Sequence, residues 1–174
     1  MVRQVGDLPL VINFLSGAAL RAAIQVLSMF QTHPVQNDSP MLVTTVTRGR
    51  KKIFNNPVFA RQAVETLYKV QEIYPFFLFG FVIMPDHIHF LLHAMAPLEI
   101  GKIMKSYKIG VGYDTGLGPI WQSRFHILFP KDSGKALHYI HLNPVRDRLS
   151  ELPEKYPWSS ASGMWDVTAL EYWW

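Results

Sequence analysis

Two histidines separated by a single apolar residue form the most distinctive chemical pattern in this sequence. His87 and His89 lie in an otherwise apolar run, residues 84–92, that is typical of a buried strand. Side chains at positions i and i+2 of a strand project from the same face, so the two imidazoles are expected side by side with Ile88 facing the other way. Neutral imidazole is a common metal ligand, so the pair would supply half of a metal site. The alternative is that both rings are structural.

A tyrosine and an asparagine about fifty residues later offer a second group of polar side chains. Tyr139 and Asn143 are four residues apart and would share one face of a helix. A phenol is a weak nucleophile with a pKa of about 10, and a helical tyrosine is more often a core or interface residue. Asn143 precedes Pro144, which disfavours helical geometry at Asn143 and predicts that the helix ends there. From the residues alone, structural roles remain open for both.

Regular elements that would position these residues begin near residue 41. Asn56 and Pro57 form a typical helix start, with a capping side chain followed by proline at the first helical position. We expect strands over 41–47, 76–84 and 87–94, an extended segment over 121–129, and helices over 57–74, 97–108 and 135–142. Four glycines predict a loop after the second of these helices: Gly110, Gly112, Gly116 and Gly118. The order β-α-β-β-α-β-α predicts an α+β fold, a ferredoxin-like or RRM-like antiparallel sheet with helices packed on one face.

The composition changes near residue 40. Residues 1–40 are expected to be an N-terminal extension with a helix at about 17–30 and a polar, proline-bounded linker at 31–40. Met41 begins the regular part and is a candidate translation start. The main domain would span residues 41–162, and residues 163–174 would form a C-terminal tail.

Bulk composition narrows the chemistry that is possible. The 174 residues are 49% hydrophobic and contain no cysteine, which excludes disulfides and thiolate metal sites and leaves nitrogen and oxygen ligands. The formal net charge of +4 suits an anionic partner. No segment qualifies as a membrane span, and we expect a cytoplasmic protein.

Joined together, several blocks resemble a known family. Residues 80–92 are similar to the His-hydrophobic-His motif of the HUH single-tyrosine transposases. Residues 121–125, 139–146 and 156–160 (Trp-Gln-Ser-Arg-Phe, Tyr-Ile-His-Leu-Asn-Pro-Val-Arg and Tyr-Pro-Trp-Ser-Ser) resemble downstream blocks of the REP-associated tyrosine transposase branch, in the same order. The resemblance covers about residues 41–162.

This resemblance implies a transposase that cleaves and rejoins single-stranded DNA. Tyr139 would attack the scissile phosphorus and form a 5′-phosphotyrosine link, releasing a free 3′-hydroxyl. His87, His89 and Asn143 would hold one divalent ion, Mg²⁺ or Mn²⁺, which polarises and orients the phosphate. The expected substrate contains hairpins or repeats, and the protein would act as a monomer or a homodimer.

Basic residues are the candidate contacts to the DNA backbone. The N-terminal cluster comprises Arg48, Arg50, Lys51 and Lys52, the stripe on the second helix comprises Lys102, Lys105 and Lys108, and the family blocks add Arg124 and Arg146. The alternative for the helical stripe is a solvated face.

The chain also departs from the family. Asp86 stands where the family often has asparagine, and the region after the second helix is shorter and richer in glycine than in relatives. Two other functions therefore remain: an inactive or domesticated module that binds single-stranded nucleic acid on the same sheet, and a metal hydrolase that uses the two histidines on another substrate.

Overall fold

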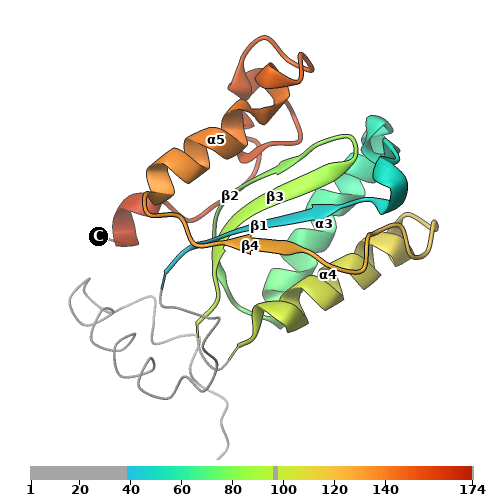
Figure 1. The fold of residues 1–174 in the computed structure, drawn as a ribbon, viewed down its shortest axis with the longest axis horizontal. Coiled ribbons are helices and arrows are strands. Elements are labelled where there is room, and N and C mark those ends of the chain that lie inside the picture. The colour runs from blue at the N-terminus through green and yellow to red at the C-terminus, as the bar shows by residue number, and fades with distance from the viewer. Residues whose placement is uncertain (1–38, 96–97, 174) are drawn as a thin grey trace, which may run out of the picture.

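An antiparallel sheet forms the centre of the computed structural model, which describes residues 39–95 and 98–173 (Figure 1). The strands are β1 (Met41–Val46), β2 (Phe77–Ile83), β3 (His87–His93) and β4 (His126–Leu128). The longer helices are α3 (Pro57–Ile73), α4 (Ile100–Asp114) and α5 (Ser133–Arg146). The helix predicted at 17–30 and nearly all of the predicted linker at 31–40 lie outside the described residues. None of the described helices has the length and apolarity needed to cross a membrane.

The strands lie in the order β2-β3-β1-β4, and each neighbouring pair is antiparallel. Together with the chain order β1-α3-β2-β3-α4-β4, this is the ferredoxin-like arrangement, so the predicted fold class is confirmed. Thr44 on the central strand β1 lies opposite His89 on β3 and opposite His126 on β4. These three residues form one row across the sheet, and their side chains therefore project from the same face.

Helix α3 begins where its sequence predicts. The side chain of Asn56 accepts a hydrogen bond from the backbone N–H of Val58 at 3.0 Å, and Pro57 occupies the first helical position. Apolar residues then recur at three- and four-residue intervals along the buried face of the helix. These residues are Ala60, Ala63, Val64, Leu67 and Val70.

The two faces of the sheet are covered unequally (Figure 1). Helices α3 and α4 pack on one face and enclose the main core, to which β3 contributes Ile88, Phe90 and Leu92. Helix α5 lies on the opposite face and packs Ala136 and Ile140 against a smaller apolar cluster. The expectation that all helices lie on one face is therefore wrong for α5.

A glycine allows α5 to approach the sheet closely. A Cβ atom at Gly80 of β2 would lie 2.2 Å from Cδ1 of Leu137 and 3.1 Å from Oγ of Ser160. A larger residue at this position would require the side chains of Leu137 and Ser160 to move.

Helix α4 is longer than its sequence indicates and includes Gly110 and Gly112, which were predicted to lie in a loop. A Cβ at Gly110 would lie 2.7 Å from Cγ2 of Thr66 on α3, and one at Gly112 would lie 2.2 Å from the backbone oxygen of Gly118. The close packing of these two glycines against α3 and residue 118 outweighs their low helix propensity.

The C-terminal region covers the free edge of β2. Ile83 donates its backbone N–H to the carbonyl of Trp158 at 2.8 Å, and the Tyr156 hydroxyl donates to the Ile83 carbonyl at 2.9 Å. Ser160 Oγ also accepts from the N–H of Phe81 at 3.0 Å. A covered edge cannot pair with another strand. The block of residues 156–160 therefore closes one edge of the sheet. The opposite edge, at β4, has no such cover among the described residues.

Candidate active site

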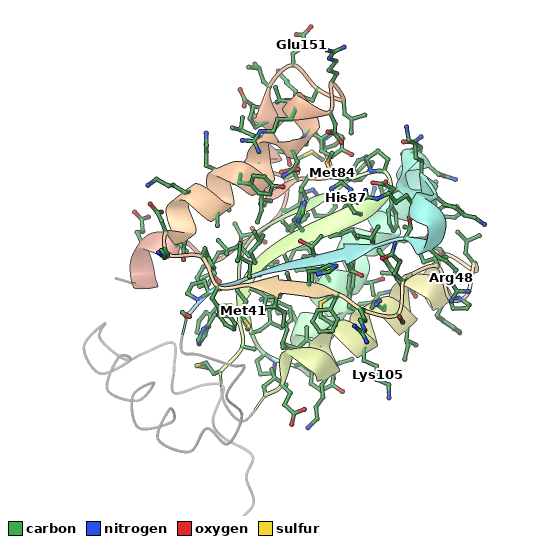
Figure 2. The ribbon with its side chains drawn as sticks, in the orientation of Figure 1. Met41, Arg48, Met84, His87, Lys105 and Glu151 are labelled. Carbon is green, nitrogen blue, oxygen red and sulfur yellow. The ribbon has the colours of Figure 1, made fainter. Side chains whose placement is uncertain are left out.

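Strand β3 presents the two histidines together at the face that carries α5, and Figure 2 labels His87 at the start of the strand. The ring centroids of His87 and His89 are 4.9 Å apart, and the ring planes meet at 82°. Ile88 between them is fully buried in the core on the other face. The expected side-by-side arrangement is therefore present.

Each imidazole is held through its Nδ1 atom. His87 Nδ1 lies 2.6 Å from Oδ1 of Asp86, and His89 Nδ1 lies 2.8 Å from Oγ1 of Thr44. When each Nδ1 donates its proton to the neighbouring oxygen, each Nε2 retains its lone pair. Neither Nε2 has a hydrogen-bond partner among the residues that the structure describes. Both rings are thus oriented in the way that hydrogen-bond partners orient metal-binding histidines.

Burial keeps His89 neutral near pH 7. Its side chain is enclosed, with 7% of the residue exposed, and this desolvation together with the nearby His87 lowers its pKa to about 4. Asp86 behaves differently. Its partial burial raises the pKa, but hydrogen bonds and charge from His87 and Arg50 outweigh that effect, so the pKa lies below its usual value. A neutral imidazole and an ionised carboxylate are the forms that favour a bound cation.

The tyrosine predicted from the sequence lies beside this histidine pair in the same chain. The ring of Tyr139 on α5 stands at 70° to that of His89, with 5.7 Å between the centroids. Tyr139 is 40% exposed, so its phenol is open to solvent rather than sealed in the core. The guanidinium carbon of Arg146 lies 5.0 Å from the centroid of the tyrosine ring, within the range of a cation–π contact.

Asn143 has a role in the helix that its sequence position did not indicate. Helix α5 continues through Asn143 and Pro144 to Arg146, so the predicted helix end at Asn143 is wrong. Pro144 lacks the N–H that would bond to the carbonyl of Ile140. The Nδ2 amide of Asn143 instead donates to that carbonyl at 3.4 Å and to the carbonyl of Tyr139 at 2.8 Å. Its Oδ1 has no partner among the described residues.

A pocket of 580 Å³ lies between α5 and strand β4 and reaches His89 and Tyr139 but not His87 or Asn143. His89, Thr44 and Tyr139 line it, and so does His126. His126 shares a sheet row with His89 through Thr44, yet sequence reasoning missed it. The only available signal was its place in a predicted extended segment, because strand pairing is not visible in a single sequence.

The predicted DNA-binding residues divide between several places. Arg50 and Arg146 lie at the site: Arg50 contacts Asp86 at 3.3 Å, and Arg146 lies over the Tyr139 ring. Arg48, Lys105 and Lys108 line a different pocket. The remaining four are exposed without lining either pocket: Lys51, Lys52, Lys102 and Arg124.

The donor types of the predicted ligands are ones that a divalent metal accepts, with an amide oxygen as the third. Within the described part of the chain, no three His, Cys, Asp or Glu side chains are close enough to hold an ion. The Nε2 atoms of His87 and His89 and the Oδ1 atom of Asn143 are, however, without hydrogen-bond partners. Two imidazole nitrogens with one amide oxygen suit a divalent ion that keeps open positions for other oxygen ligands.

Comparison with known sequences supports the resemblance noted above. Residues 38–112 match the family described as "Transposase IS200 like". This range includes both histidines and ends before the helix that carries Tyr139. No curated protein matches the sequence.

Solved structures give the fold. The chain is similar to the REP-associated tyrosine transposase bound to a REP hairpin, with a TM-score of 0.62, 21% identity, and coverage of 82% of this chain and 94% of that one. The chain is also similar to a protein of Deinococcus radiodurans R1 that is provisionally described as a transposase, with a TM-score of 0.49, 15% identity, and coverage of 68% of this chain and 94% of that one. The resemblance to the single-tyrosine transposases is therefore confirmed, in sequence over residues 38–112 and in fold over most of the chain.

Proposed function

We propose that the protein is a transposase that cleaves and rejoins single-stranded DNA through a covalent link to Tyr139. The observation that carries this proposal is the position of the Tyr139 ring, 5.7 Å from that of His89. A partly exposed phenol beside an oriented pair of imidazoles is not required for packing, and it suits attack on a phosphate that is held by a metal.

The proposed reaction has two steps, and both take place at the Tyr139 oxygen. The Tyr139 oxygen forms a bond to phosphorus, the bond from phosphorus to the 3′-oxygen breaks, the phenolic proton is lost and the 3′-oxygen gains a proton. The reverse attack by a 3′-hydroxyl releases the tyrosine and joins the strands. Because the link conserves the phosphodiester bond, rejoining needs no nucleotide cofactor.

His87, His89 and Asn143 would hold the divalent ion, Mg²⁺ or Mn²⁺. When bound, it would supply positive charge to the phosphate oxygens. Asp86 and Thr44 would keep the imidazoles in the required tautomer and orientation. Arg146 would hold the tyrosine ring through the cation–π contact and lies where it can also meet a phosphate.

The substrate follows from the relative that was solved with a REP hairpin. We infer a single strand that contains a hairpin, bound by a protein with net charge +4. Tyr139 and His89 meet within one chain, so a monomer can assemble this part of the site, and a homodimer is not required for it.

Formation of a covalent adduct tests the proposal. The protein is incubated with Mn²⁺ and an end-labelled hairpin oligonucleotide, and adducts that survive denaturing electrophoresis are measured. We expect an adduct that disappears in Tyr139→Phe and after chelation of the metal. Tyr74→Phe is the matched control, because Tyr74 lies at the C-terminal end of α3 and lines neither of the two pockets.

Other outcomes identify the alternatives. Binding of DNA without any adduct, even with Mn²⁺ present, would favour an inactive nucleic-acid-binding module. Cleavage that persists in Tyr139→Phe would favour a metal hydrolase. Either result would contradict the proposed strand transfer.

A further inference from the structure

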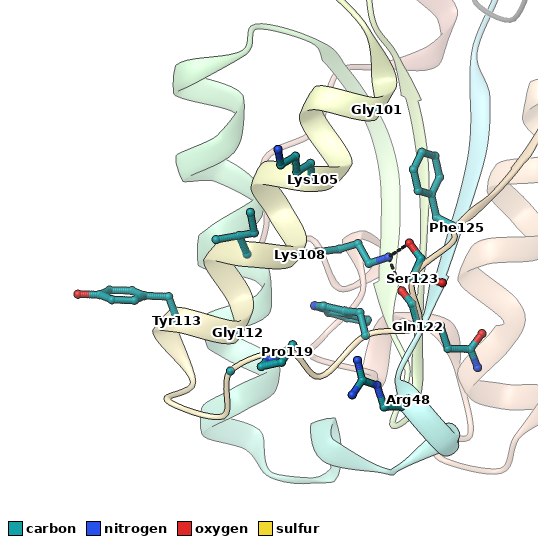
Figure 3. Close-up of a pocket in the computed structure, with 13 residues that line it drawn as sticks. Arg48, Gly101, Lys105, Lys108, Gly112, Tyr113, Pro119, Gln122, Ser123 and Phe125 are labelled. Carbon is teal, nitrogen blue, oxygen red and sulfur yellow. Dashed lines mark hydrogen bonds between the residues drawn. The ribbon is translucent and has the colours of Figure 1, made fainter.

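A second pocket, of 640 Å³, lies between α4 and the segment that leads into β4 (Figure 3). Its volume is within the range of about 300–1,000 Å³ that is usual for ligand sites. None of its lining residues lines the cleft around Tyr139. The close contact between Gly112 of α4 and the backbone of Gly118, described above, fixes one end of the pocket.

The pocket is lined by aromatic and aliphatic side chains that are not all covered. Trp121 is 5% exposed and packs into the core, where its ring lies 5.4 Å from that of Phe54. Phe125 is half-buried, while Ile109 and Tyr113 on α4 are largely exposed. Apolar groups that gather around a hollow, rather than singly on the surface, indicate a binding site.

All charged side chains that line this pocket are positive. Its lining includes Arg48, Lys105 and Lys108 and no carboxylate. Lys108 is held against the wall of the pocket by hydrogen bonds. Its ammonium donates to the backbone oxygens of Gln122 at 2.5 Å and Ser123 at 3.2 Å (Figure 3). The side chains of Arg48 and Lys105 make no hydrogen bond or ion pair within the described residues. The charge is therefore available for an anion.

The pocket adjoins the candidate active site along the chain. Residues 121, 122, 123 and 125 line it, and the residues that follow at once, 126–128, form β4 and line the cleft around Tyr139. β4 is an edge strand of three residues, about 10 Å long at the usual rise. An extended single strand can follow this edge from one pocket to the other.

We propose that this second pocket binds one unpaired nucleotide of the single-stranded DNA, away from the scissile phosphate. The base would lie against the half-buried ring of Phe125, and a neighbouring phosphate would meet Arg48 and Lys105. Aromatic rings that stack on bases, combined with cations that follow the backbone, are the usual means of binding single strands. This inference rests on the proposed function and extends it to a second contact with the substrate.

Two lysines on the same helix provide a matched test. Lys105 lines the pocket, and Lys102 is exposed one turn earlier without lining it, so Lys102→Ala removes the same charge elsewhere on α4. Binding of fluorescent oligodeoxythymidine, about twenty nucleotides long, is measured by anisotropy over a range of salt concentrations. We expect Lys105→Ala to weaken binding about 5–10-fold and Lys102→Ala less than about twofold, with a salt dependence reduced by about one charge for Lys105→Ala only.

Photocrosslinking then locates the base. The same oligonucleotide carrying 5-iododeoxyuridine is irradiated with the protein, and modified peptides are mapped by mass spectrometry. Crosslinks to Tyr113, Trp121 or Phe125 support the pocket. Crosslinks confined to the cleft around Tyr139, or equal affinities for the two lysine variants, would overturn it.

The adduct assay separates this inference from the proposed function. An adduct at Tyr139 together with unchanged binding by Lys105→Ala would refute the pocket alone. Crosslinks in the pocket without any adduct would refute strand transfer and support the pocket. A protein that binds no oligodeoxythymidine would refute the pocket, and the adduct assay on the hairpin oligonucleotide would then decide strand transfer by itself.

Discussion

The two faces of β3 differ in what their side chains contact. On one face Ile88, Phe90 and Leu92 are fully buried beneath α3 and α4. On the other, His87 and His89 are held by hydrogen bonds to Asp86 and Thr44, and His89 lines the cleft, while Leu91 beyond them is buried beneath α5. The same strand thus serves stability on one side and chemistry on the other.

This difference shows how a rigid site is built on a strand. The apolar face anchors β3, so the imidazoles on the opposite face need only local partners to be oriented. Helix α5 then brings Tyr139 over His89 without sealing it. We therefore expect substitutions on the two faces to separate stability from function, and four experiments test this.

The largest effect is expected from substituting two residues that are adjacent in β3 but lie on opposite faces of the sheet. Phe90→Ala should lower the free energy of unfolding by about 3–5 kcal/mol, because it leaves a cavity in a closed core. His89→Ala should lower it by no more than about 2 kcal/mol and yet abolish Mn²⁺ binding. Urea unfolding and metal titration measure the two quantities. Equal losses of stability would mean that the histidine face is also a structural core.

The pH dependence of stability should come partly from His89. Its pKa is about 4 in the folded protein and about 6.5 when unfolded, so the unfolded chain takes up the proton first. The free energy of unfolding should therefore fall as pH decreases from about 6.5 to about 4, by at most about 3 kcal/mol from this group. The metal-free protein and His89→Gln are compared by thermal unfolding across this range. The same slope in both proteins would contradict the assignment.

The partners of Nδ1 should set the metal affinity. Asp86→Ala leaves His87 without its acceptor, and Thr44→Val does the same for His89, so each should weaken Mn²⁺ binding about 10–100-fold. Asp86→Asn is the control, because its amide oxygen can still accept the imidazole proton, and its effect should be only a few-fold. Affinity is measured by calorimetry. If Asp86→Ala and Asp86→Asn behave alike, the carboxylate acts through its charge rather than as an acceptor.

The smallest effect concerns the two roles of Asn143. Asn143→Ala should lower the free energy of unfolding by about 1 kcal/mol, because the Ile140 carbonyl loses its substitute donor. Adding Pro144→Ala supplies a backbone N–H for that carbonyl and should restore stability but not metal binding. Recovery of metal affinity in the double variant would show that the amide acts only through the helix.

Most helices and strands could be predicted because the sequence patterns that indicate them are local. The cap at Asn56, the break at Pro85-Asp86 and the alternation of residues along β3 each depend on neighbours in the chain. The predictions failed where a distant segment intervenes. Gly110 and Gly112 remain helical because α3 and residue 118 pack against them, and Pro144 stays in α5 because the side chain before it replaces the missing donor.

The site was predictable only in part for the same reason. The spacing of His87 and His89 predicts their shared face, and the spacing of Tyr139 and Asn143 predicts a shared helix face. That α5 lies on the histidine side of the sheet could not be derived from spacing, since helices can pack on either face. His126 joins the row of Thr44 and His89 only through strand pairing.

The sequence alone determined which residues can do chemistry and which local elements carry them, because periodicity and caps act over a few residues. Tertiary structure decided which groups meet: a phenol and an imidazole fifty positions apart, and the edge strand that links two pockets. Such contacts depend on strand order and on the face that each helix covers. Both arise from burying the whole apolar surface of the chain at once, which no local pattern describes.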